Sequence, residues 1–216
     1  MGYYAGFERS LAVGPNTQST YYLDKLSLIN EQIKPVDILF IGDSLTDNGR
    51  WSEILPGCII TNHGIQGDNT ARLLDRLDIS LSLNPKIAFI MIGINDLRMG
   101  KSVAEIVESY EKIVEKIAPK VPQVHIQAIV FMGAGNELLN ARVFQLNRQL
   151  SSLAAKQIQT DFVDVNSVLS AENTLKAEYT HDGLHLNGLG YEMWTNLILQ
   201  RLSKLELSPN CSPETP

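Results

Sequence analysis

Short apolar runs alternate with longer amphipathic segments along this chain of 216 residues. The short runs are rich in β-branched and aliphatic residues and lack polar alternation, which is typical of strands buried on both faces of a parallel sheet. We expect strands at residues 38–41, 58–61, 87–92, 124–131 and 162–165.

Between these runs, apolar residues recur at spacings of three and four, as an amphipathic helix requires. Helices are predicted at residues 17–33, 51–55, 69–83, 102–118, 137–157 and 188–205. Asp68 is placed to cap the helix that starts at residue 69, and Ser102 with Glu105 matches a capping box. This alternation of strand and helix predicts an α/β fold with one parallel sheet and helices on both of its faces.

The pattern has no internal repeat and no linker, so we expect residues 1–216 to form a single domain. Residues 1–17 are rich in glycine and tyrosine and are predicted to be an irregular N-terminal arm. Residues 207–216 have the composition of a flexible tail.

The charge of the chain narrows the range of partners. Its 18 basic and 24 acidic residues give a net charge of −6, and the basic residues do not cluster. Nucleic acid and anionic membrane surfaces are therefore not expected partners, because both are bound through basic patches. No apolar run is long enough to span a bilayer.

The first residues lack the basic start and apolar core of a signal peptide, so we expect a cytoplasmic protein. Cys58 lies in an apolar run and Cys211 lies in a polar tail. These unlike contexts do not suggest that the two cysteines form a disulfide.

Polar clusters follow the first three predicted strands, at residues 42–44, 64–68 and 93–96. Parallel strands bring their carboxyl ends to one edge of the sheet, which is where open α/β folds bind ligands. A fourth cluster, at residues 182–185, precedes the last helix and can lie over the same edge. Ser44 in the first cluster is a candidate nucleophile, although a serine at that position could also simply cap a helix.

Together the clusters supply the groups that acyl transfer requires. His185 could take the proton of the Ser44 hydroxyl, and Asp182, three positions before it, could orient the imidazole. The N–H of Gly67 and the side-chain amide of Asn95 are candidate donors to the oxyanion.

Other residues near these clusters are less specific candidates for the site. Asp43 adjoins the candidate nucleophile, and it is favoured as a structural carboxylate over a second acid. Asp43, Arg98, Met99 and Gly133 remain candidates for contacts with the substrate. No metal site is predicted, although His181, Asp182 and His185 could be interpreted as metal ligands.

The chain resembles the SGNH hydrolases, also called GDSL esterases and lipases. Four blocks match in order: G-D-S-L at residues 42–45, a glycine block around Gly67, G-x-N-D at residues 93–96 and D-x-x-H at residues 182–185. The resemblance implies that Ser44 is the nucleophile, that His185 is the base and that Asp182 is its partner. It also implies an oxyanion hole of Ser44 N–H, Gly67 N–H and the Asn95 amide.

The implied fold is a flavodoxin-like α/β/α sandwich of three layers on a five-stranded parallel sheet. Residues 62–77 are also similar to the acetylhydrolase branch that includes the platelet-activating-factor acetylhydrolase catalytic subunits.

The leading hypothesis is a serine esterase that uses no cofactor and hydrolyses short-chain, especially acetyl, esters of a sugar, a lipid or a similar small molecule. Two rival hypotheses stay open: a metal-dependent hydrolase that uses His181, Asp182 and His185, and a non-catalytic carbohydrate-binding module on the same fold. A homodimer is compatible with a domain of this size.

Overall fold

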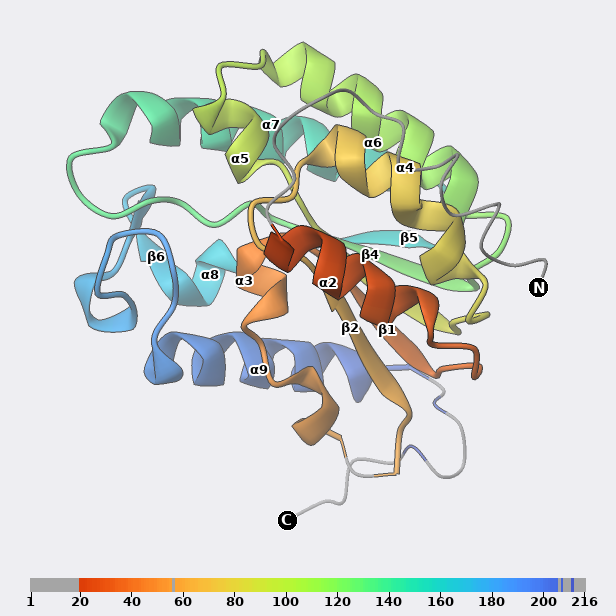
Figure 1. Ribbon diagram of the computed structural model, residues 1–216. Helices are drawn as coiled ribbons and strands as arrows, with labels where there is room; N and C mark the ends of the chain where they lie inside the picture. The colour runs from red at the N-terminus through yellow and green to blue at the C-terminus, as the bar shows by residue number, and fades with distance from the viewer. Residues whose placement is uncertain (1–19, 56, 206, 208–210, 212–216) are drawn as a thin grey trace.

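The computed structural model describes residues 20–55, 57–205, 207 and 211, so the expected N-terminal arm lies outside the described residues. At its centre is a parallel sheet of five strands in the order β2-β1-β3-β4-β5 (Figure 1). The strands are β1 (Ile38–Gly42), β2 (Ile60–Gly64), β3 (Ile87–Met91), β4 (Gln123–Gln127) and β5 (Thr160–Val163). This architecture confirms the expected α/β fold class.

Helices connect the strands and cover the sheet. The α-helices are α2 (Thr20–Asn30), α3 (Ser44–Asp47), α4 (Thr70–Leu81), α5 (Ile94–Arg98), α6 (Val103–Ile117), α7 (Glu137–Ala155), α8 (Asn166–Leu169) and α9 (Gly188–Leu202). Two short 3-10 helices, η1 (Trp51–Glu53) and η2 (Ala177–Tyr179), lie in connecting segments. A small antiparallel pair, β6 (Ser170–Ala171) and β7 (Thr174–Leu175), occupies a segment where the sequence pattern predicted no regular structure.

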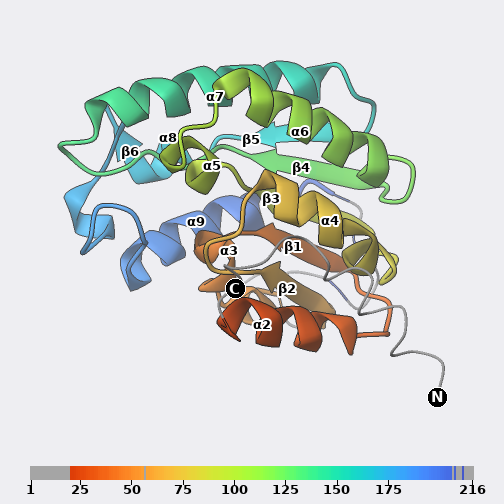
Figure 2. The same ribbon diagram turned by 45° about the horizontal axis from the view of Figure 1, so that its top comes forward.

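The strand order explains the three layers. The chain steps from β1 to β2 in one direction and from β2 through β3 and β4 to β5 in the other. Because such crossovers are right-handed, the two directions place their connecting segments on opposite faces. Helices α4, α6 and α7 lie on one face, and α9 lies on the other (Figure 2).

The core is densest around β1 and β3, whose residues are all buried. Phe40 of β1 stacks on Trp51 at a centroid distance of 4.3 Å and on Phe89 of β3 at 4.9 Å. Trp194 of α9 meets the edge of Trp51 at 4.8 Å. These rings join the central strands to α9 and to the segment that follows α3, so the first polar cluster stands on a packed base.

The ends of several elements differ from the prediction. Strand β2 begins at Ile60, two residues later than expected, and continues through the polar residues up to Gly64, three residues beyond its expected end. Helix α4 is capped by Asn69, whose side chain accepts the Arg72 N–H, and not by Asp68. Helix α6 has the predicted capping box between Ser102 and Glu105.

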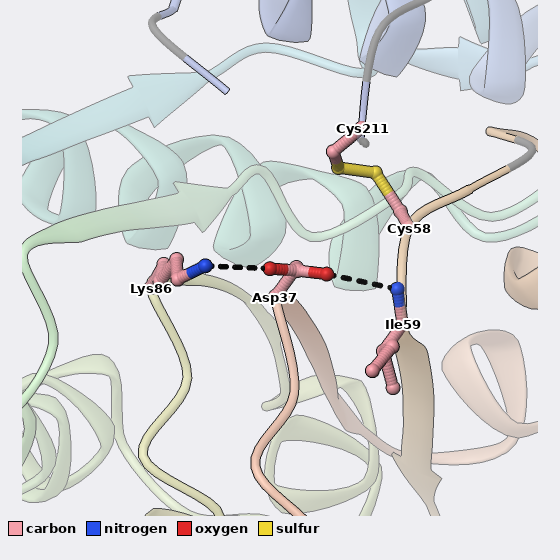
Figure 3. The surroundings of a disulfide bond; sticks show 5 residues. All are labelled: Asp37, Cys58, Ile59, Lys86 and Cys211. Carbon is pink, nitrogen blue, oxygen red and sulfur yellow. Dashed lines mark hydrogen bonds and ion pairs between the residues drawn. A yellow bond between two sulfur atoms is a disulfide. The ribbon is translucent and has the colours of Figure 1, made fainter. Parts of the chain in front are cut away.

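The prediction for the cysteines was wrong, because Cys58 and Cys211 form a disulfide with a Cα–Cα distance of 4.5 Å (Figure 3). The bond joins the segment after α9 to the segment that enters β2. Beside it, Asp37 accepts the Ile59 N–H and forms an ion pair with Lys86. Cys211 is 1% exposed, so part of the expected flexible tail is anchored to the body.

Among the described residues, no helix combines the length and the apolar character needed to cross a membrane.

Candidate active site

Ser44 is the first residue of α3 and is separated from the end of β1 by Asp43 alone. The turn is tight at Gly42, where a Cβ atom would lie 2.2 Å from the Met91 carbonyl oxygen and 2.2 Å from Thr46 Oγ1. Only glycine fits this close approach of two backbones. The side chain of Asp43 caps α3 by accepting the Leu45 N–H at 3.0 Å.

Three side chains form a chain of hydrogen bonds that ends at Ser44. Ser44 Oγ lies 3.1 Å from His185 Nε2, and His185 Nδ1 lies 2.7 Å from Asp182 Oδ2. Since an ionised carboxylate only accepts hydrogen bonds, Nδ1 carries the proton and Nε2 of the neutral ring accepts from the serine hydroxyl. The structure therefore brings together the three residues that the sequence singled out.

The loop that carries Asp182 and His185 is held by its own hydrogen bonds. Asp182 Oδ1 accepts the N–H groups of Leu184 at 2.9 Å and His185 at 2.7 Å. Burial alone would raise the pKa of Asp182, but these hydrogen bonds and the one from the His185 ring hold the pKa well below its usual range. Thr180 Oγ1 donates to the His185 carbonyl at 2.7 Å, so the loop is also tied across its base.

The two expected oxyanion donors lie close in the fold, Gly67 in the loop after β2 and Asn95 in the first turn of α5, which follows β3. Gly67 has a φ of +72°, in the left-handed region, and the space where a Cβ would stand is open. Asn95 Nδ2 donates to the carbonyl oxygen of Asp68 at 2.8 Å. This hydrogen bond joins the loop after β3 to the loop after β2 one residue beyond Gly67.

Buried ion pairs stabilise the segments that carry Gly67 and Asn95. Asp68 pairs with Arg76 of α4 at 2.8 Å, and Arg76 also donates to the carbonyl oxygen of Gly42 at 3.2 Å. Asp96 accepts hydrogen bonds from the N–H and the hydroxyl of Thr70 and from Lys101. These contacts make Asp96 a structural carboxylate, and they join the segments after β1, β2 and β3 into one unit.

Asp43 lies inside this unit and is 1% exposed, so its side chain is buried beneath the turn. Burial is the main cause that raises its pKa to about 7; the Leu45 N–H opposes this rise, and the nearby charges of Asp68 and Asp96 contribute to it.

The remaining candidates are spread around the site. Arg98 and Met99 are exposed at the end of α5. Gly133 is buried, and its N–H donates to the Gly183 carbonyl at 2.7 Å, so it lies against the loop that carries Asp182. His181 is exposed and is no part of the chain of hydrogen bonds described above.

The site geometry is poorly suited to a metal ion. Both ring nitrogens of His185 are engaged, one with Ser44 and one with Asp182. Within the part of the chain that the structure describes, no group of three or more His, Cys, Asp or Glu side chains could hold a metal ion. His63 and His125 are buried in the sheet, where burial lowers their pKa values to about 3 and about 4.

One supporting contact had no signal in the sequence. The hydroxyl of Tyr191 on α9 donates to the Leu45 carbonyl at 2.8 Å. It holds the turn of the candidate nucleophile from the face opposite to Arg76. An aromatic residue in an amphipathic helix is usually interpreted as a core residue. Spacing alone therefore could not predict the hydrogen bond from Tyr191 to the turn.

The chain is similar to known proteins in sequence and in structure. The GDSL-like lipase/acylhydrolase family matches residues 40–193. An N-acylneuraminate cytidylyltransferase of Streptococcus agalactiae is 31% identical over 124 residues, which cover 57% of this chain and 30% of that protein. The chain thus spans less than a third of this curated relative.

Two further matches cover more of their proteins. The human platelet-activating factor acetylhydrolase IB subunit alpha1 is 26% identical over 167 residues, which cover 73% of this chain and 71% of the relative. A solved structure from Streptococcus pneumonia, named after platelet activating factor, has a TM-score of 0.73 and 27% identity. That match covers 83% of this chain and 90% of the other.

Proposed function

We propose that this chain, which belongs to the GDSL-like lipase/acylhydrolase family, is a carboxylic ester hydrolase and, more narrowly, a serine esterase for short-chain esters. The observation that carries the proposal is the chain of hydrogen bonds from Ser44 through His185 to Asp182. It joins a hydroxyl, a base and an orienting carboxylate in the order that nucleophilic catalysis requires.

In the proposed mechanism, Ser44 Oγ attacks the ester carbonyl carbon while His185 Nε2 takes the hydroxyl proton. The Ser44 N–H, the Gly67 N–H and the Asn95 amide stabilise the oxyanion. His185 then gives the proton to the leaving alcohol oxygen, and an acyl-enzyme remains on Ser44. Water, deprotonated by His185, releases the acid and restores the serine.

The ionised Asp182 carboxylate favours the imidazolium that forms on His185 in each step. Its hydrogen bonds to two backbone N–H groups fix its direction, and its lowered pKa keeps it charged at neutral pH.

Two observations favour acetyl over longer acyl groups. One relative is an acetylhydrolase by name. The loops after β1, β2 and β3 are also short and are joined to one another, so they build no apolar cover for a long chain. The names of the relatives leave the alcohol open, because one refers to platelet-activating factor and the other to N-acylneuraminate.

The direct kinetic test is hydrolysis of p-nitrophenyl acetate by the wild type and by Ser44→Ala. We expect kcat/KM of the variant to fall by about a thousandfold or more, because the nucleophile is lost while binding is kept. Addition of a chelator should leave the wild-type rate unchanged. A series of p-nitrophenyl esters whose rate peaks at long acyl chains would contradict the acetyl preference.

The two rival functions make different predictions in the same assay. A metal-dependent hydrolase would lose its activity with the chelator and keep it in Ser44→Ala. A carbohydrate-binding module would hydrolyse none of the activated esters. The hydrogen bonds that engage both ring nitrogens of His185 favour the serine mechanism over both.

The disulfide gives an indication of the cellular compartment of the protein. Disulfides are rare in the reducing cytosol and common in oxidising compartments. The bond between Cys58 and Cys211 therefore weighs against the cytoplasmic location expected from the sequence, and we propose an oxidising compartment. Alkylation of free thiols at the moment of cell lysis tests this, since a fully alkylated pair would favour the cytoplasm.

A further inference from the structure

Helix α2 precedes residues 40–193, the segment that the family matches, and lies beside β2 at the edge of the sheet (Figure 2). Its buried residues Tyr22, Leu26 and Ile29 form a small apolar cluster with Ile65, separate from the main core. Two contacts of α2 go beyond this packing, because each of them joins the helix to a segment of the candidate active site.

Helix α3, which carries the candidate nucleophile, is too short to fix its own direction. A helix leaves the carbonyl groups of its last turn without partners inside the helix, and α3 is hardly longer than one turn. Donors from other elements bind these groups instead. The hydroxyl of Tyr191 donates to the Leu45 carbonyl at 2.8 Å, and Asn62 Nδ2 donates to the carbonyl of residue 46 at 2.9 Å. The direction of Ser44 therefore depends on what surrounds α3.

The side chain of Asp47, the last residue of α3, is bound by α2. Asp47 Oδ1 lies 2.6 Å from Lys25 Nζ, and Oδ2 accepts a hydrogen bond from the hydroxyl of Tyr21. Tyr21 and Lys25 are four positions apart, so they lie on the same face of α2. The Asp47 side chain is 3% exposed, which shields the carboxylate from water. One face of α2 thus holds the end of α3 that is opposite to Ser44.

Ile65 joins α2 to the segment of the first oxyanion candidate. Its side chain is fully buried in the apolar cluster of α2, and its N–H donates to the Gly42 carbonyl at 3.1 Å. Ile65 stands two residues before Gly67. Helix α2 therefore contacts the segment after β1 at Asp47 and the segment after β2 at Ile65.

The ion pair is not needed to cover the edge of the sheet. The apolar cluster around Ile65 already holds α2 on the body, and a buried ion pair adds little net stability because both ions lose water. What the polar contacts add is direction, since Lys25 and Tyr21 each bind one oxygen of Asp47. Such contacts suit an element that must keep a short helix in one orientation.

The position of α3 matters because the reaction depends on distance. Ser44 Oγ lies 3.1 Å from His185 Nε2, and proton transfer requires this hydrogen bond. A displacement of about 1 Å in a catalytic group can lower a rate on the order of a hundredfold.

We propose that α2 positions the nucleophile: by holding Asp47, it keeps Ser44 within hydrogen-bond distance of His185. Lys25 and Tyr21 act from α2, and both are positioning residues because neither contacts the reacting atoms. The proposal rests on the proposed esterase function and adds to it the contribution of a helix outside the segment that the family matches.

The test removes the contact without leaving one charge buried alone. The double variant Lys25→Met with Asp47→Asn removes both charges and keeps side chains of similar size. Tyr21→Phe removes only the hydroxyl, and Lys25→Arg keeps the cation. The matched control is the double variant Lys116→Met with Asp78→Asn, which removes a Lys–Asp pair between α6 and α4 with a distance of 3.0 Å. Lys116 lies in the last turn of α6, at the amino ends of the strands.

Two readouts are compared at a temperature where circular dichroism shows every variant to be folded. One is hydrolysis of p-nitrophenyl acetate, and the other is the rate at which a fluorophosphonate labels Ser44. In the double variant at residues 25 and 47, we expect kcat and the labelling rate to fall by about tenfold while KM stays within about twofold, because the nucleophile is displaced and the substrate contacts remain.

The other variants grade this effect. Tyr21→Phe should lower kcat and the labelling rate by about threefold, because one of the two contacts is kept. Lys25→Arg and the control should both retain the wild-type values.

A kcat and a labelling rate within twofold of the wild type in the double variant at residues 25 and 47 would overturn the proposal. An equal loss in the control would also overturn it, because the effect would then be one of general stability. If that double variant does not fold, wild-type rates in Tyr21→Phe overturn the proposal. The esterase function fails by a separate result, namely undiminished p-nitrophenyl acetate hydrolysis by Ser44→Ala.

Discussion

Asp43 precedes the candidate nucleophile in sequence, but its buried side chain stabilises the turn. Its carboxyl group is 1% exposed and caps α3, and Oδ2 has no hydrogen-bond partner among the described residues. A buried carboxyl with one unused oxygen is easier to keep neutral than charged, which is why burial raises its pKa to about 7.

This pKa makes stability depend on pH in an unusual direction. An unfolded aspartate has a pKa of about 3.9. Between that value and about 7, the folded protein holds a proton on Asp43 that the unfolded chain has released. Stability from this group is therefore present at low pH and is lost as the pH rises through the window.

We predict that Asp43→Asn removes this loss, because the amide can still accept the Leu45 N–H and does not ionise. From pH 5 to pH 8, the free energy of unfolding of the variant should gain about 2–3 kcal/mol relative to the wild type. Urea denaturation of both proteins at the two pH values measures the difference. The lowered pKa values of His63 and His125 act in the opposite direction, but they are common to both proteins and cancel. An equal difference at both pH values would show that Asp43 is ionised throughout.

At the scale of single residues, the sequence predicts the candidate site residues better than the residues that hold them in place. Ser44, Asp182 and His185 could be predicted because acyl transfer limits the residue types and because three of four polar clusters follow strands. The contacts of Arg76 and Tyr191 could not, because each depends on which helix packs beside the turn.

Among the elements, the strands that are buried on both faces were predicted closely. Residues of β1 and β3 are all buried and have no polar members, so each run is distinct in sequence. Edge strand β2 was expected to end at residue 61 but continues to Gly64, since its polar residues 62 and 63 resemble a turn. Asn62 is in fact held by the carbonyl oxygens of Thr46, Asp47 and Gly49, and His63 by Ser80 and Gln32.

The disulfide joins two connecting segments whose pairing nothing in the sequence indicates. Cys58 and Cys211 are separated by 153 residues, and only the path of the chain after α9 brings them together. Closing so long a loop restricts the unfolded chain strongly, by about 4–5 kcal/mol in the loop-entropy model.

We therefore expect Cys58→Ser to lower the melting temperature by several degrees, and reduction of the wild type to have a similar effect. Cys211→Ser is the matched control, since it breaks the same bond from the other side. Thermal unfolding followed by circular dichroism measures all three. Equal melting temperatures for the wild type and both variants without reductant would contradict this role.

In the whole molecule, the candidate active site and the disulfide lie at opposite ends of the central strands. Ser44 and the oxyanion candidates follow the carboxyl ends of β1, β2 and β3, whereas the disulfide and the pair of Asp37 and Lys86 precede the same strands (Figure 3). Because the sheet lies between them, loss of the disulfide should leave kcat/KM unchanged at temperatures where the variant is folded.

At the edge of the sheet that carries the candidate active site, the order of the strands brings the site residues together. Strands β2, β1 and β3 are neighbours, so three loops meet there, and the loop before α9 adds His185. The strand count and the meeting of these loops follow from the sequence pattern. Elements β6, β7 and η2 do not, because they are too short to give a periodic signal.

The central claim is that Ser44 is the nucleophile, activated by His185. The most direct test is mass spectrometry of the protein after treatment with a fluorophosphonate, which transfers its phosphonyl group to an activated serine and releases fluoride. We predict a single adduct on the peptide that contains Ser44, none in Ser44→Ala, and much slower labelling in His185→Ala. An unlabelled Ser44 in the folded wild type, or equal labelling in His185→Ala, would contradict the claim.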